Sequence, residues 1–238
     1  MKDPYEKLLS RKRKWTPVKP KAGVFKTGAA ETIRRALAIR HMELPVGEFI
    51  KEGLEKDVPK NARKLLEDNV VDEIRHDIAL QYIVDAHGAD TQAENEAMRL
   101  RDAWIGHPDH TITKALVAER AIFFVLLPFF RFTGDPALRT VSADISRDEQ
   151  IHVATNSLVC GELGLVPSNS LDKLRKATIN WIMQPLGSNS DKYLDKNFWL
   201  DSSDRLMYDG KAPQLSETQA GRMPAFFEHS NVNLPQYS

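Results

Sequence analysis

Two copies of one short motif, Glu-x-x-His, constrain this chain more than any other feature. Glu73 and His76 form the first copy, and Glu149 and His152 form the second. On an α-helix, residues three positions apart lie about 60° apart around the axis, so each copy can direct a carboxylate and an imidazole to one point. Helical bundles that hold two iron or manganese ions use two such motifs, plus one carboxylate from each of two further helices. The doubled motif therefore predicts helices and two additional carboxylates.

Two glutamates stand at matching distances from the motifs. Glu43 lies 30 positions before Glu73, and Glu119 lies 30 positions before Glu149. The repeated spacing predicts a helix, a connection and a second helix, twice over. Glu48 competes with Glu43, but it lies only 25 positions before Glu73, which leaves less room for a turn. An apolar stripe also favours Glu43: Ile33, Ala36 and Ile39.

Hydrophobic periodicity places these glutamates on apolar helix faces. The stripe that contains Glu73 and His76 also contains Leu66, Val70, Leu80 and Ile83. A single Glu-x-x-His is often a solvated surface motif, but a buried carboxylate is costly unless it is paired or bound to metal. Four carboxylates converging with two histidines therefore predict bound cations. Oxygen and imidazole donors without a thiolate suit iron or manganese better than zinc.

Helical patterns extend along most of the chain, without an alternating strand pattern of useful length. We predict an all-α fold, a four-helix bundle with additional helices. The expected core helices are residues 29–43, 60–87, 111–133 and 136 to Gly161 or Gly164. Further helices are expected from a capping box at residues 91–94 and over residues 170–184. Pro128 should kink its helix or open a hydrogen bond near the site.

Three segments are expected along the chain. Residues 1–27 form a basic N-terminal arm, which we expect to be solvated and partly disordered. Residues 28–211 form the helical domain. After Gly187 the sequence becomes polar and rich in turn residues, and residues 212–238 are expected to form a tail.

Charge and cysteine content narrow the functional classes. Lys and Arg together number 33, as do Asp and Glu, so no overall charge points to a nucleic acid or a membrane partner. The single cysteine, Cys160, excludes an intramolecular disulfide and fits a reducing compartment. The hydrophobic run at residues 122–130 is far too short to span a membrane. Residues 1–30 lack the apolar core of a signal peptide, so we expect a cytoplasmic protein.

The second motif and the residues around it resemble a known family. Residues 146–152 are Ser-Arg-Asp-Glu-Gln-Ile-His, similar to the Arg-Asp-Glu-x-x-His signature of the small, radical-generating subunit of class I ribonucleotide reductase. Ile145 and the spacing from Glu119 to Phe123 are similar as well. The resemblance covers residues 25–165, and the chain length is most similar to the compact members carried by marine cyanobacterial phages. It implies a ferritin-like bundle with a flexible C-terminal tail, in the host cytoplasm if the protein is viral.

The resemblance also implies an activity. A dinuclear metal centre would activate oxygen, store an oxidising equivalent and generate a thiyl radical in a separate large subunit that converts ribonucleotides to deoxyribonucleotides. Radical transfer would involve Asp148, bonded to His76 and to Trp15, and Tyr237 in a tail that docks to the large subunit. The family further implies a homodimer. The implied metal ligands are Glu43, Glu73, His76, Glu119, Glu149 and His152.

One departure from the family concerns where the oxidising equivalent is stored. Most relatives carry a radical-storing tyrosine four residues after the first ligand histidine, where this chain has Leu80. Tyr82 follows Glu73 by nine residues and should face away from the site. A site without that tyrosine resembles the subgroup that uses manganese and iron together, which also has glutamate at the position of Glu43. We therefore expect Mn/Fe, with Fe/Fe or Mn/Mn as alternatives.

Two other interpretations remain open. A ferritin-like oxidase could use the same two-metal bundle on a lipid-like ligand, and it would need a pocket but no tail tyrosine. An iron-storing ferritin or a structural metal bundle would explain the ligands, but not Asp148, Trp15 and the tail.

Overall fold

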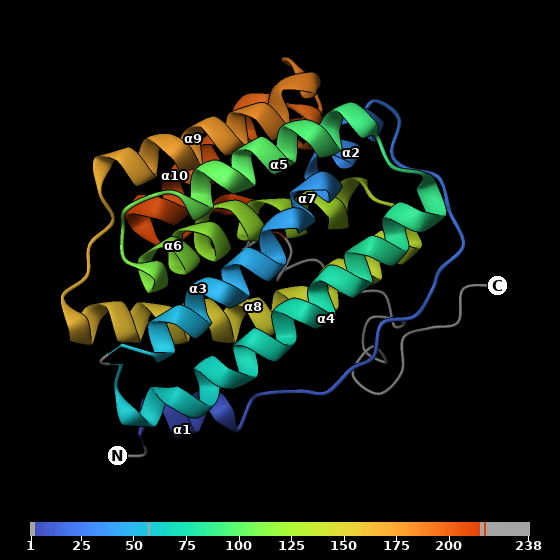
Figure 1. Cartoon of the computed structure of the whole chain (residues 1–238). Helices are drawn as coiled ribbons and strands as arrows, with labels where there is room; N and C mark the ends of the chain where they lie inside the picture. The colour runs from blue at the N-terminus through green and yellow to red at the C-terminus, as the bar shows by residue number, and fades with distance from the viewer. Residues whose placement is uncertain (1–2, 57, 215–216, 218–238) are drawn as a thin grey trace.

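Helices supply all the regular secondary structure in the computed structural model, which describes residues 3–56, 58–214 and 217. Four helical segments form a ring: α3 packs on α4, α4 on α8, α8 on α6 and α6 on α3 (Figure 1). The all-α prediction is therefore confirmed for the described residues. The bounds of these helices are α3 (Glu43–Leu54), α4 (Arg63–His87), α6 (Thr111–Ala118) and α8 (Pro136–Leu163).

Further helices cover the ring on two sides. On one side lie α2 (Ala30–Ala38), α5 (Thr91–Ile105), α9 (Asn169–Met183) and α10 (Lys196–Asp209) (Figure 1). On the other side, α1 (Pro4–Leu9) packs against α4 and α8. Short helical turns complete the connections: η1 (Ile39–Met42), η2 (Lys60–Ala62), η4 (Gln184–Leu186) and η5 (Lys192–Leu194).

Local capping residues fix the ends of the long core helices. The Asp135 side chain accepts a 2.8 Å hydrogen bond from the Leu138 backbone N–H at the start of α8. Gly164, with φ of 65°, ends the same helix in the left-handed conformation that glycine adopts without a steric cost. Gly88, with φ of 85°, ends α4. These predicted boundaries are confirmed.

Two predicted helix boundaries are wrong. The helix expected to end at residue 43 continues, because α2, η1 and α3 follow one another without a break to Leu54. Pro45 lies in the first turn of α3, where its missing N–H has little effect on the helical hydrogen bonds. The cap of α5 is Asp90 rather than Thr91, since its side chain accepts a 3.0 Å hydrogen bond from the Ala93 backbone. Helix α10 was not expected; it buries Trp199.

The helix predicted over residues 111–133 is divided by a π-helical turn. This turn, η3 (Glu119–Phe123), joins α6 to α7 (Phe124–Thr133). The Ser203 hydroxyl of α10 donates to the Ala121 carbonyl at 2.6 Å. Pro128 has no N–H to offer the Phe124 carbonyl, which instead accepts a long 3.5 Å bond from Gln214. The hydrogen bonding that a regular helix would supply is thus partly replaced by side chains. Within the described chain, no helix combines the length and hydrophobicity needed to cross a membrane.

The N-terminal arm contacts the bundle through a few buried side chains, whereas most of its described basic residues are exposed, as expected for a solvated segment. Tyr5 is buried, and its hydroxyl donates to Glu162 on α8 at 2.7 Å. Farther along, the Gly23 backbone N–H donates to Asp135 at 2.7 Å. The first residues of the predicted tail are not fully exposed, since Ala212 and Gln214 are buried. Tyr237 and most of the predicted tail lie outside the described residues.

Candidate metal centre

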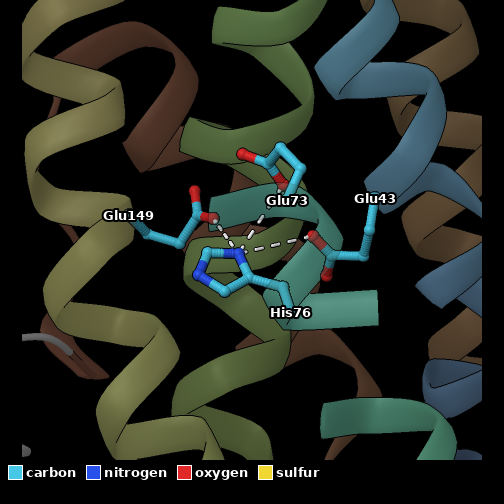
Figure 2. Close-up of side chains that lie close together, drawn as sticks. All are labelled: Glu43, Glu73, His76 and Glu149. Atoms are coloured by element: carbon cyan, nitrogen blue, oxygen red, sulfur yellow. Dashed lines mark ion pairs between the residues drawn. The ribbon is translucent and has the colours of Figure 1, made fainter. Parts of the chain in front are cut away.

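The six predicted ligand side chains meet inside the ring of four helices, where each is at most 1% exposed. Figure 2 shows three of the carboxylates arranged around one imidazole. The six side chains come from α3, α4, α8 and the first residue of η3, which directly follows α6. We call this set the ligand cluster: Glu43, Glu73, His76, Glu119, Glu149 and His152.

One half of the ligand cluster is centred on His76. Its Nδ1 lies 3.2 Å from a Glu149 oxygen, 3.6 Å from a Glu73 oxygen and 3.7 Å from a Glu43 oxygen (Figure 2). Of the two histidines, Glu43 lies close to His76 only. The predicted competitor, Glu48, is instead exposed and pairs with Lys51 on the surface.

The other half is centred on His152. Its Nδ1 lies 2.9 Å from a Glu73 oxygen, 3.4 Å from a Glu149 oxygen and 3.8 Å from a Glu119 oxygen. Glu73 and Glu149 therefore lie between the two histidines, whereas Glu119 belongs to this half alone. Asn156, one turn after His152, holds the second Glu119 oxygen with a 2.7 Å hydrogen bond.

The inward-facing atoms of the ligand cluster lack hydrogen-bond partners among the described residues. These atoms are one oxygen of Glu43 and of Glu119, both oxygens of Glu73 and of Glu149, and both histidine Nδ1 atoms. Buried polar atoms are normally satisfied, because leaving them unpaired costs free energy. Two overlapping groups have ligand atoms within 4.8 Å of one another, and each could hold a metal ion: Glu43, Glu73, His76 and Glu149; and Glu73, Glu119 and His152.

Burial and the close approach of charged groups shift the pKa values of the ligand cluster. Burial raises the pKa of Glu43 well above its ordinary value, and burial together with the Glu149 charge does the same for Glu119. Burial also opposes a charge on Glu73, but His152 and His76 outweigh it and lower the pKa of Glu73 to about 2. The histidine pKa values are raised well above the ordinary value, because neighbouring carboxylates outweigh the effect of burial. Without metal, protons neutralise much of the cluster's negative charge.

Each histidine contacts an aspartate through Nε2, on the side away from the cluster. That aspartate precedes the other Glu-x-x-His motif. His76 Nε2 lies 3.2 Å from Asp148 Oδ2, and His152 Nε2 lies 3.1 Å from Asp72 Oδ2. Such outer contacts orient a ligand imidazole and increase its basicity. Asp148 was predicted from the sequence, whereas the role of Asp72 was not. The available signal was its position, since each aspartate immediately precedes the glutamate of its motif.

Trp15 reaches the ligand cluster from the arm. Its indole N–H donates to Asp148 Oδ2 at 2.7 Å, and its ring stacks near His76 with centroids 6.2 Å apart. Trp15, Asp148 and His76 therefore form one continuous chain of contacts. Leu80 is buried on α4, one turn beyond His76, whereas Tyr82 is half-buried with its ring below the Lys19 ammonium.

No protein-family model matches the chain, and no curated protein matches it either.

We predict that Glu43→Ala will weaken divalent-metal binding while Glu48→Ala will not. Glu43 faces His76, but Glu48 is exposed on the same helix. Changes outside a metal's ligand shell already cost about 10–100-fold in affinity, so loss of a ligand should cost at least about tenfold. Equilibrium dialysis with metal analysis measures the difference. Equal binding by the two variants would contradict the assignment of Glu43.

We also predict that metal affinity rises with pH and that binding releases protons. The raised pKa values of His76, His152, Glu43 and Glu119 favour their protonated forms in the metal-free protein. Metal ligands must lose their protons, so the affinity should rise about tenfold per pH unit for each proton released. Calorimetry in buffers of different ionisation enthalpy counts these protons. Binding without proton release would contradict this charge distribution.

Proposed function

We propose that the chain is the small, radical-generating subunit of class I ribonucleotide reductase. The single observation that carries this proposal is the contact chain from Trp15 through Asp148 to His76. It extends from the N-terminal arm to a buried ligand cluster. Metal storage or a purely structural metal site would not require an indole bonded to the aspartate behind a ligand histidine. The resemblance of residues 146–152 to the family signature supports the same function.

The cluster would hold a dinuclear centre. Glu73 and Glu149 would be available to both ions, because each lies close to both histidines. Glu43 would complete the half at His76, and Glu119 the half at His152. When bound, the ions would supply oxygen activation and storage of an oxidising equivalent. The carboxylates would balance the positive charge, and the surrounding apolar helices would limit access of water.

The residues of the contact chain would connect this centre to the partner. Trp15 is 7% exposed and belongs to the arm, outside the four-helix ring. Its ring would donate an electron, while Asp148 fixes the indole N–H and the His76 imidazole at one carboxylate oxygen. Tyr237 would continue the path within the tail. The partner would be the large subunit, in which a cysteine would be oxidised to the thiyl radical.

A homodimer is part of this proposal. Three apolar side chains form an exposed stripe along α4, at 56%, 48% and 39% exposure: Val71, Ile74 and Ile78. Leu44, on the adjacent helix α3, is 46% exposed. An exposed apolar stripe of this kind is typical of a protein interface. It lies on the same helix as Glu73 and His76, so the interface would support the metal centre directly.

A second candidate function is a ligand-binding oxidase that uses the same metal centre. The observation that favours it is an apolar cavity of about 430 Å³ beside the helix that leads to Glu119. Its walls include Leu116, Cys160 and Met207. An oxidase of this kind would retain a lipid-like molecule after purification, and mass spectrometry of solvent extracts would detect it.

We predict that Trp15→Phe will abolish turnover with the large subunit without removing metal. Phenylalanine retains an aromatic ring but cannot donate the hydrogen bond to Asp148. Trp181→Phe is the matched control, since Trp181 on α9 bonds to Glu96 on α5, and neither helix contributes to the ligand cluster. Ribonucleotide reduction and metal content are measured on both variants. Full turnover by Trp15→Phe would exclude Trp15 from radical transfer.

We further predict that the protein stores its oxidising equivalent on manganese and iron together. Leu80 replaces the tyrosine expected in the family, and it is buried one turn from His76. Apoprotein is reconstituted in air with iron, with manganese, or with both, followed by electron paramagnetic resonance. A long-lived coupled manganese and iron signal with two ions per chain is expected. A tyrosyl radical formed with iron alone would contradict the prediction from Leu80.

A further inference from the structure

The two halves of the ligand cluster differ in what lies behind their histidines. Behind His76, Asp148 accepts its closest hydrogen bond from the uncharged indole of Trp15, at 2.7 Å. The nearest cation is Arg75, whose Nη1 lies 3.5 Å from the same oxygen. The Asp148 charge is thus shared mainly with the imidazole and the indole N–H.

Behind His152, Asp72 is held by two cations. One of its oxygens contacts both His152 and the ammonium of Lys12, and its other oxygen accepts a 2.8 Å hydrogen bond from Arg75. Lys12 is fixed in place by a second hydrogen bond of 3.2 Å to Asn69.

The Lys12 charge acts strongly on Asp72 because both side chains are largely buried. The Lys12 side chain is 12% exposed and that of Asp72 is 3% exposed, so solvent and salt screen the pair only weakly. An aspartate behind a ligand imidazole increases its donor strength. A cation on that aspartate withdraws part of its charge, and the imidazole becomes a weaker donor. His152 should therefore bind a metal ion less strongly than His76.

The number of carboxylates does not distinguish the two halves, since each histidine Nδ1 lies within 3.8 Å of three carboxylates. Lys12 and Trp15 lie three positions apart on one arm and contact the two different aspartates. The N-terminal arm therefore supplies both contacts that distinguish the two halves, a cation on Asp72 and an uncharged indole on Asp148.

We propose that Lys12, acting through Asp72, lowers the metal affinity of the half-site at His152, so that the two half-sites fill in order, with His76 first. This inference rests on the proposed dinuclear centre. Ordered filling is the property that a centre with two different ions requires, because equal half-sites would accept either ion at random. Lys12 is a positioning residue here, since it contacts no ligand of the cluster directly.

The test is an anaerobic titration of the full-length metal-free protein with Mn²⁺, counting free ion by electron paramagnetic resonance. The native chain should bind two ions with separable dissociation constants. Lys12→Met should lower the second constant by about tenfold, the lower end of the effect of outer-shell changes, and leave the first unchanged. Lys14→Met is the matched control, because Lys14 is exposed and only two positions away.

Two further variants separate charge from packing. Lys12→Arg keeps the cation and should retain the native ratio of the two constants. Asp72→Asn removes the charge behind His152 and should raise the second constant by about 10–100-fold. In a Glu119→Gln background, which removes a ligand of the His152 half alone, Lys12→Met should leave the remaining strong constant unchanged.

The outcomes distinguish this inference from the proposed function. Two bound ions with a second constant that Lys12→Met does not alter would overturn the role of Lys12 and leave the dinuclear centre intact. Equal changes in both constants would also overturn it. Fewer than two ions bound by the native protein would overturn the dinuclear centre and, with it, this inference. Circular dichroism confirms that each variant is folded before titration.

Discussion

The enclosure of four carboxylates and two imidazoles by apolar helices is the constraint on which this structure depends. Their inward-facing atoms lack hydrogen-bond partners among the described residues, and protons or metal ions must balance their charge. The four-helix ring brings the donors together, while Asn156, Asp72 and Asp148 fix the orientation of individual ligands from behind. The surrounding helices complete this arrangement, since α10 donates a hydrogen bond to the π-helical turn that Glu119 begins.

Much of the fold could be predicted because its signals are local. The caps at Asp135, Gly88 and Gly164 act within a few residues, and the motif spacing defines which side chains share a helix face. The continuation through Pro45 was missed, because proline resembles a helix terminus although the first turn accommodates it. Helix α10 was missed because its polar sequence hides the burial of Trp199.

The candidate site likewise combines residues that could be predicted from the sequence with contacts that could not. The six candidate ligands were predicted from repeated spacing, and the structure brings all six together. The crossed pairing of Asp72 with His152 and of Asp148 with His76 depends on how α4 packs against α8, which no single motif encodes. The contact of Lys12 with Asp72 depends on the path of the arm, whose basic composition alone indicated solvation. Trp15 was selected through family resemblance rather than from any spacing in this chain.

The path of the arm has a consequence for biosynthesis. Lys12 leaves the ribosome 60 residues before Asp72, and Trp15 leaves it 133 residues before Asp148. Contacts between residues so distant in sequence form late, because the intervening chain must first be made and folded. A newly made chain therefore completes its ligand cluster, and the contact of Trp15 with Asp148, only after α8 has emerged. Metal captured earlier would meet histidines that their aspartates do not yet orient.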